Sequence, residues 1–263
     1  MKKILYMTII AALAIVSCVK DNTTEVNRGR AIDFRVATTR AVETTTDNLD
    51  KIWVTAIGET GNIHFSKVEF VKNGNYFTTT NEYYWPSDGS ILTFYAYAPD
   101  EPAITADGAT LTLDGSIQKI ASFSPKPAIK DQMDLIVAVT TGNKDDADDG
   151  VELVFDHALS QIQVNAFSNN TGYKYLIKGV RIGQVVSTAD FNFADKDWDL
   201  AATKSNYEIT YDTPVTLGAE SQNLMGDNGN AMLIPQTLVP WNPADDNTNE
   251  EMGSYVAFNI NIT

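Results

Sequence analysis

The stretch 91–99 does most to limit the folds that this chain can adopt. Its apolar residues occupy alternate positions: Leu92, Phe94, Ala96 and Ala98. The residues between them form the other face: Thr93, Tyr95 and Tyr97. A period of two is that of a β-strand, and small alanines beside a phenylalanine favour a face on which a second sheet packs closely. The stretch therefore predicts a strand inside a layered β-structure.

Similar segments recur along the chain with turn residues between them. We expect strands at 31–37, 51–57, 63–71, 110–113, 117–123, 134–139, 151–155, 161–166, 173–182, 207–211, 232–234 and 254–262. The apolar parity switches between Phe65 and Val68 and again around Gly179, which predicts a bulge at each place. No convincing helical period follows residue 17. The pattern indicates an all-β fold class.

The chain opens with a short, mostly apolar segment, 4–16, that follows Lys2 and Lys3. This order is typical of an export signal, and the segment is shorter than the roughly 20 residues that a membrane-spanning helix needs. Cys18, the only cysteine, comes directly after it and resembles the acylated cysteine of a bacterial lipobox. We expect a signal peptide at 1–17, lipid on Cys18 and a flexible tether at 18–30. The alternative is an ordinary secretory signal with an unrelated cysteine.

The charge of the chain limits its partners. The formal net charge is −15, and losing Lys2 and Lys3 with the signal makes it −17. Such a surface repels phosphate backbones, which argues against nucleic acid as a partner. It also argues against attachment to anionic lipid by charge, so the lipid on Cys18 is the expected contact with a membrane. A hydrophobic fraction of 43% is nevertheless that of a folded chain.

The length suggests two domains, because about 100–200 residues make one. The acid-rich stretch 143–150 separates two sets of expected strands. We place an N-terminal domain at 31–142, an inter-domain loop at 143–150 and a C-terminal domain at 151–263. The acids of the loop do not follow the alternate ligand positions of a calcium-binding loop, and no glutamate closes it. A solvated loop is the favoured interpretation.

Catalytic chemistry has little support in the sequence. The only histidines, His64 and His157, are far apart in sequence, and metal ligands usually come in clusters with fixed spacing, so we expect structural histidines, no metal and no cofactor. Ser160 has no Gly-x-Ser-x-Gly frame. Two hypotheses stay open. Asp195, Asp197 and Asp199 contain a possible acid and base for glycoside hydrolysis. A sugar-stacking platform of exposed aromatics would draw on Trp85, Trp198 and Trp241, although core positions are favoured for them.

Several motifs, taken together and in order, resemble the fimbrillin-like surface lipoproteins of Bacteroidota, which build or anchor type V pili. They are the lipobox at Cys18, Ile-Asp-Phe at 32–34, Thr-Arg-Ala at 39–41, Tyr-Trp-Pro at 84–86, the strand at 92–99, Gln-Met-Asp-Leu at 132–135, Val-Phe-Asp-His-Ala-Leu-Ser at 154–160, and Leu-Ile-Pro-Gln at 233–236 before Trp241. The resemblance implies two tandem transthyretin-like β-sandwiches after a lipoprotein signal peptide.

The resemblance also implies a route of assembly. A trypsin-like protease cleaves pilus-forming members after an arginine, which here is Arg40, before Ala41. The first strand then leaves, and the open groove accepts a strand from a neighbouring subunit, which restores buried apolar surface and backbone pairing. The residues of the exchangeable strand would be Ile32, Phe34 and Val36. Implied partners are other pilus subunits, the membrane through Cys18 and a surface ligand on a host or bacterial cell.

The end of the chain departs from the family pattern. Members usually continue past the strand that matches 254–262, whereas this chain stops at Thr263. Three interpretations follow: a truncated product with an incomplete C-terminal sandwich, a last strand that forms a sheet edge, or a last strand that is offered to a partner. Shaft, tip and anchor subunits all fit the pattern. The resulting hypothesis is a non-enzymatic structural or adhesive subunit of a lipid-anchored pilus at the outer membrane. The alternative is a monomeric glycan-binding surface lipoprotein, and a glycosidase is the third possibility.

Overall fold

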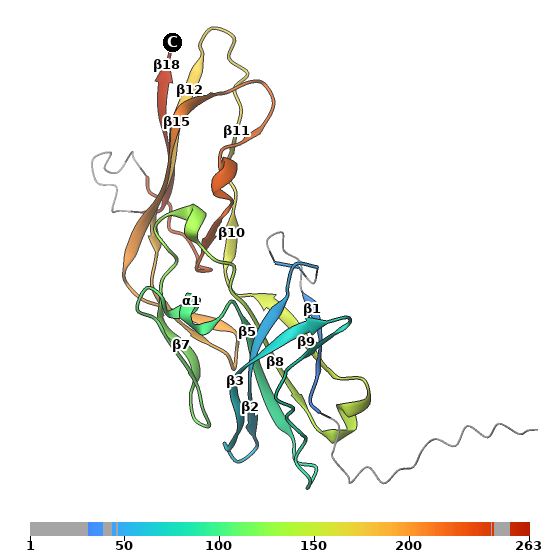
Figure 1. Ribbon diagram of the computed structural model, residues 1–263. Helices are drawn as coiled ribbons and strands as arrows, with labels where there is room; N and C mark the ends of the chain where they lie inside the picture. The colour runs from blue at the N-terminus through green and yellow to red at the C-terminus, as the bar shows by residue number, and fades with distance from the viewer. Residues whose placement is uncertain (1–30, 39–43, 46, 243, 245–252) are drawn as a thin grey trace, which may run out of the picture.

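The computed structural model describes residues 31–38, 44–45, 47–242, 244 and 253–263 of the chain. The fold is mostly β, as predicted. The molecule is elongated, with the first strands at one end and β12, β15 and β18 at the other (Figure 1). Among the described residues, no helix combines the length and the apolar character that a membrane span requires. Cys18, Arg40 and Ala41 lie outside the described residues.

The first body is a sheet of seven strands that closes on itself. In spatial order the strands are β1 (Phe34–Thr38), β4 (Tyr76–Thr78), β3 (Ile63–Asn73), β2 (Lys51–Gly58), β5 (Leu92–Ala98), β8 (Ile136–Gly142) and β9 (Val151–His157). Ile52, Phe94 and Leu153 are buried inside it, with at most 2% of each exposed. The predicted strand at 51–57 is confirmed by β2, which lies between β3 and β5.

A second sheet packs against one side of this body. Its order is β14 (Asp197–Leu200), β13 (Ala189–Asn192), β7 (Gln118–Phe123) and β6 (Thr110–Leu113). Phe123, Phe191 and Trp198 from this sheet share an apolar cluster with Tyr97 and Val137 of the first body. The period-two pattern of β5 thus has both of its faces buried, because Phe94 points into the first body and Tyr97 into the cluster between the sheets.

The third part is built on the sheet β15 (Lys204–Thr216), β12 (Tyr175–Val186) and β18 (Tyr255–Ile262). Two short strand pairs accompany it: β10 (Ser160–Ile162) with β17 (Ala231–Leu233), and β11 (Asn165–Ala166) with β16 (Gln222–Asn223). Its core includes Ile177, Ile182 and Tyr207. The bulge predicted at Gly179 is confirmed by a shift of register after Ile177.

Strand pairing crosses the loop 143–150, where the sequence suggested a boundary. β9 follows that loop, yet it pairs with β8 and β1 of the first body. β13 likewise pairs with β7. The loop itself holds a short 3-10 helix, η2 (Lys144–Asp148), in which Asn143 and Asp146 form a reciprocal cap. Strands from the later half of the chain therefore complete sheets begun by the earlier half, and two tandem sandwiches stay a prediction.

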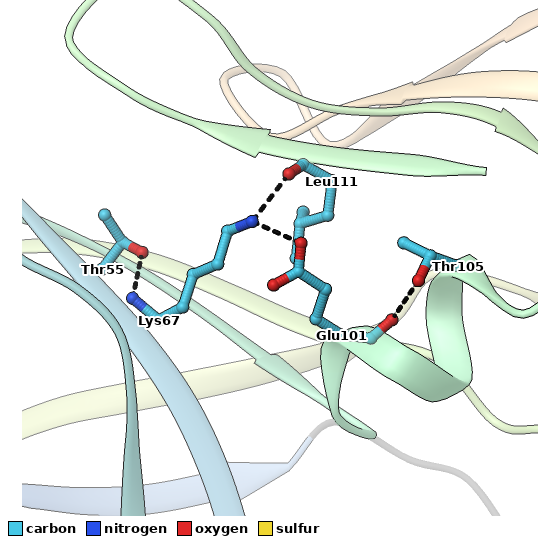
Figure 2. A network of polar contacts seen from close by, with 5 residues as sticks. All are labelled: Thr55, Lys67, Glu101, Thr105 and Leu111. Atoms are coloured by element: carbon cyan, nitrogen blue, oxygen red, sulfur yellow. Dashed lines mark hydrogen bonds and ion pairs between the residues drawn. The ribbon is translucent and has the colours of Figure 1, made fainter.

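The bulge predicted in the third strand is confirmed and has a structural use. Lys67 adopts a positive φ of 51°, and its backbone N–H donates to Thr55 Oγ1 over 2.9 Å. Its Nζ then reaches Glu101 Oε1 at 2.5 Å and the carbonyl oxygen of Leu111 at 2.9 Å (Figure 2). Because Leu111 belongs to β6, the bulge ties the first body to the second sheet.

The short helices were not predicted from the sequence pattern. Glu101 opens α1 (Glu101–Thr105), where Asp100 accepts a hydrogen bond from the N–H of Ala103 and Pro102 lies in the first turn. Two more 3-10 turns are η1 (Ile129–Asp131) and η3 (Gly226–Asn228). Five residues are too few to show a helical period, so only the Asp-x-Pro cap at 100–102 could have indicated α1.

Candidate functional site

The first strand lies between two others. β1 pairs in parallel with β9 along five positions, from Phe34 with Val151 to Thr38 with Phe155. On its other side it pairs with β4 at one position only, Phe34 with Phe77. The residues before it are also bonded, because the N–H of Ile32 donates to the carbonyl of Tyr83 over 2.7 Å. β9 therefore supplies most of the backbone pairing that holds β1.

The inward-facing side chains of β1 and of the segment just before it carry the apolar burial of this part of the chain. Ile32 is 1% exposed and Phe34 is fully buried, while Val36 packs at the edge of the same cluster. The Phe34 ring meets Phe70 edge-on at a centroid distance of 4.8 Å and Phe94 at 5.2 Å. Full burial of one such side chain contributes about 1.5–3 kcal/mol, and edge-on aromatic pairs add to it. The three residues predicted to form the exchangeable strand thus lie together in one groove.

One polar residue of this segment is poorly accommodated. The side chain of Asp33 is partly buried, and burial, followed by repulsion from Glu82, raises the pKa of its carboxyl group. Its backbone carbonyl accepts a hydrogen bond from the N–H of Val151 over 2.9 Å. Gly150, with φ of 72°, brings the chain close beside it, since a Cβ there would lie 3.3 Å from that same carbonyl oxygen. The charge of Asp33 opposes docking of the strand that its backbone helps to hold.

The candidate sugar platform does not form. Trp85 and Trp198 are 7% and 8% exposed, and the Trp198 indole N–H donates to the carbonyl of Ala158 over 2.7 Å. Their favoured core positions are confirmed. Trp241 is partly exposed and meets the Tyr255 ring at 5.6 Å, in a different part of the molecule. The tryptophans therefore share no common surface.

The candidate catalytic acids lie on an exposed hairpin. Asp195, Asp197 and Asp199 are all exposed around the buried Trp198, and the Asp197 carboxylate accepts a hydrogen bond from the N–H of Trp198 over 2.8 Å. Catalytic acid–base pairs work in clefts that exclude water and tune their pKa values. These three acids are instead exposed on the surface of the hairpin.

Both histidines have hydrogen-bond partners within the fold. His64 Nε2 lies 2.7 Å from the carbonyl oxygen of Tyr84, and His157 Nδ1 lies 2.9 Å from Asp134 Oδ1 in a buried pair. Within the described ranges, no group of three or more His, Cys, Asp or Glu side chains is arranged to hold a metal ion. In the loop 143–150, Asp146 caps the backbone of Asn143.

The partners of β1 were not predicted from the sequence pattern. Phe70 and Phe94 form the floor of its groove, and Tyr83 binds the segment before it. The parity of their own strands showed that these residues face a core. It did not show that the same core faces the first strand, because alternation identifies a face and not its neighbour.

Comparison with known proteins agrees with this β-architecture. The family model described as Fimbrillin-like matches residues 39–261. Fimbrium subunit Fim1C of Phocaeicola vulgatus is 27% identical over 242 residues, which cover 78% of this chain and 64% of that protein. A fimbrial protein from Bacteroides vulgatus has a crystal structure that superposes with a TM-score of 0.64 at 21% identity, over 78% of this chain and 77% of that one. The chain thus corresponds to less than two thirds of the length of its curated relative, and it belongs to the fimbrillin-like family.

Proposed function

We propose that this protein is a non-enzymatic structural or adhesive subunit of a cell-surface fimbrium, and that it assembles by exchanging β1 for a strand of a neighbouring subunit. The observation that carries the proposal is the burial of Phe34 in a strand held between β4 and β9. Membership of the fimbrillin-like family supports the fimbrial role.

Removal of β1 would leave a slot with defined chemistry. Phe70 and Phe94 would lose the ring that covers them, and β9 would lose its partner along five positions. Apolar surface and unpaired backbone groups in one groove favour an incoming extended strand with alternating apolar residues. A donor that places an aromatic residue at the position of Phe34 would restore both kinds of interaction.

The position of β1 in the chain favours its release. It is the first strand, and residues 39–50 are its only covalent link to β2. A single cut after Arg40 would free β1 together with everything before it, so no other strand would have to unthread. The pairing with β4 at one position is a weak hold on that side. The same cut would separate the rest of the subunit from Cys18.

In this proposal Cys18 carries the lipid that keeps the uncut subunit at the outer membrane. The order of Lys3, the apolar segment 4–16 and the lone cysteine supports acylation there. Labelling of cells with a fatty-acid probe should mark the wild-type protein and spare Cys18→Ala. Equal labelling of the two would remove the lipid anchor from the proposal.

Limited trypsin digestion tests the strand exchange. The expected product begins at Ala41, lacks β1 and forms oligomers on size-exclusion chromatography with light scattering. Arg40→Ala should prevent that product and stay monomeric, whereas the matched control Arg30→Ala should behave as wild type. An added peptide of residues 31–38 should slow oligomer formation, and the same peptide with Phe34→Asp should not. A cut product that stays monomeric would contradict the proposal and leave a monomeric surface binder, including a glycan-binding one, as the function.

A further inference from the structure

The segment that leads into β1 runs antiparallel to the segment that follows β4. Ala31 forms an antiparallel bridge with Tyr84, and the next residues of the two segments share a backbone hydrogen bond of 2.7 Å. In an antiparallel pair, each step forward on one segment is matched by a step back on the other. The same register, carried on by two residues from the bridge, places Asp33 opposite Glu82.

Two acids therefore oppose each other where β1 docks. Like charges directly opposite each other destabilise a β-pair. Burial, followed by repulsion from Glu82, raises the pKa of the Asp33 carboxyl group, which agrees with the register. The hydroxyl of Tyr84 donates to Glu82 Oε2 and holds that carboxylate in place. Among the ion pairs of the described residues, none includes Asp33 or Glu82.

The base closest to Asp33 in the chain has an acidic neighbour of its own. Arg35 lies on the same face of the strand, and its cross-strand neighbour on β9 is Glu152; both side chains are exposed. On the β9 side, the residue beside Asp33 is Gly150, which comes just before the partner of Phe34. The position of Asp33 thus has an acid on one side and a residue without a side chain on the other.

We propose that Glu82 selects the charge of the strand that fills the groove, so that a donor with lysine or arginine opposite Glu82 binds more tightly than β1 does. The inference rests on the proposed function and names the chemistry of the partner. That partner is an extended strand with an aromatic residue at the position of Phe34 and a base immediately before it. Because β1 carries an acid at this position, its replacement by such a donor is favoured in one direction.

Two physical arguments favour a base over a neutral residue in the donor. A base opposite Glu82 replaces a repulsive cross-strand pair by an attractive one. The net charge of −15 also attracts a basic strand and steers its approach. The apolar contacts of the groove do not change, because the side chains of residues 33 and 34 point to opposite faces of the strand.

A double-mutant cycle in the intact chain tests the selection without requiring β1 to leave. Asp33→Asn should slow the exchange of the amide hydrogens of β1, and Asp33→Lys should slow it further, by about threefold. When Glu82→Gln is added to both variants, the advantage of lysine over asparagine should disappear. Hydrogen exchange followed by mass spectrometry of the fragment 31–38 measures each step, and circular dichroism checks that the variants are folded.

Reversal of the charge at position 82 gives a sharper result. Glu82→Lys should slow exchange in β1 when Asp33 is kept, and the further change Asp33→Lys should then speed it. The matched control is Glu152→Gln, which removes an exposed acid on the other side of β1 and should leave the preference at position 33 unchanged. A preference for lysine that survives Glu82→Gln, or that persists with Glu82→Lys, would overturn the inference.

Peptides extend the test to the incoming strand. The protein is the full chain cut once after Arg40, with both pieces present, and labelled peptides of residues 31–38 are added. Fluorescence anisotropy should show that the peptide with Asp33→Lys binds about threefold more tightly than the peptide with Asp33→Asn, and more tightly still than the natural peptide. The chain with Glu82→Gln should bind the lysine and asparagine peptides nearly equally.

The two experiments separate failure of the inference from failure of the proposed function. Peptides that all enter the cut chain with equal affinity would keep strand exchange and overturn the selection by Glu82. Coupling between positions 33 and 82 in the intact chain, without entry of any peptide into the cut chain, would instead overturn strand exchange and leave Glu82 acting on β1 alone.

Discussion

His157 Nδ1 lies 2.9 Å from Asp134 Oδ1, and the two side chains are only 9% and 7% exposed. The pair joins the segment that leads into β8 to the last residue of β9, and the N–H of Ala158 adds a bond to the carbonyl of Leu135 over 2.8 Å. Within the described part of the chain, Asp134 Oδ2 and His157 Nε2 are buried without a hydrogen-bond partner. The contact between His157 Nδ1 and Asp134 Oδ1 therefore supplies the polar stabilisation of this pair.

Asp134→Ala should be strongly destabilising. It leaves the imidazole buried without its hydrogen-bond partner, which costs about 1–3 kcal/mol. Urea unfolding at neutral pH would measure the loss. The matched control is Glu69→Ala, which removes the exposed ion pair with Lys51 and should change the free energy of unfolding by about 1 kcal/mol or less. The double change Asp134→Leu with His157→Leu should recover much of the loss, and a double variant less stable than Asp134→Ala would contradict this account.

Phe34→Ala should loosen β1 specifically. The side chain is fully buried against Phe70 and Phe94, and truncation of a buried phenylalanine costs about 3–5 kcal/mol. We expect lower stability in urea and faster exchange of the amide hydrogens of β1 and β9. Arg35→Ala, on the exposed side of the same strand, should change stability by about 0.5 kcal/mol or less. Equal effects of the two variants would show that β1 is not held by the groove.

Two substitutions of Lys67 separate the free-energy cost of its backbone conformation from the contribution of its side-chain contacts. Lys67→Ala and Lys67→Gly both remove the bonds to Glu101 and Leu111. Only the alanine must adopt the positive φ of 51° with a Cβ present. Lys67→Gly should therefore be more stable than Lys67→Ala by about 1 kcal/mol in urea unfolding. Equal stability of the alanine and glycine variants would show that residue 67 does not need the left-handed conformation, or that the bulge relaxes in the variants.

The sequence predicted local structure well because the local signals are short-range. The alternation from Leu92 to Ala98 required a strand, and the parity switches at Lys67 and Gly179 required bulges. The strand expected at 31–37 is present as β1, and Phe34 is buried in it. Each of these inferences needs only residues close together in the chain.

The long-range arrangement could not be predicted in the same way. The parallel pairing of Phe34 with Val151 joins the first strand to one far along the chain. Neither segment contains a sequence signal that identifies the other as its partner. The acidic loop 143–150 looked like a boundary because polar residues follow an apolar run. Its residues instead connect β8 and β9, two adjacent strands of one sheet. The polar composition of a loop indicates only that the loop is exposed to solvent. Loops within hairpins and linkers between domains are both exposed, so composition does not distinguish them.

The stability of the protein should depend on pH through Asp33, because β1 docks in spite of the unfavourable charge of this carboxylate. Burial and Glu82 raise the pKa of this carboxyl above 3.8, so its contribution to stability is fully present below that value and is lost as pH rises through the folded-state pKa. Asp33→Asn removes the charge and should stabilise the protein at pH 7. The advantage over wild type should shrink as the pH falls toward about 3.8, where the wild-type carboxyl also becomes neutral.

Asp114→Asn provides the control with the opposite sign. Hydrogen bonds from Ser116 and Ile117 lower the pKa of Asp114, so its contribution is present above 3.8 and is lost as pH falls through its lower folded-state value. Asp114→Asn should therefore destabilise at pH 7, and the difference from wild type should fade in acid. Urea midpoints of the wild type and both variants at pH 7 and at a series of pH values below 3.8 measure the two trends, because the contribution of Asp114 is lost only in that lower range. Asp33 lies in the segment that leads into β1. A gain in stability from Asp33→Asn at pH 7 should therefore also appear as slower exchange of the amide hydrogens of β1. A loss of stability at that pH would contradict the conclusion that the charge of Asp33 opposes docking of this strand.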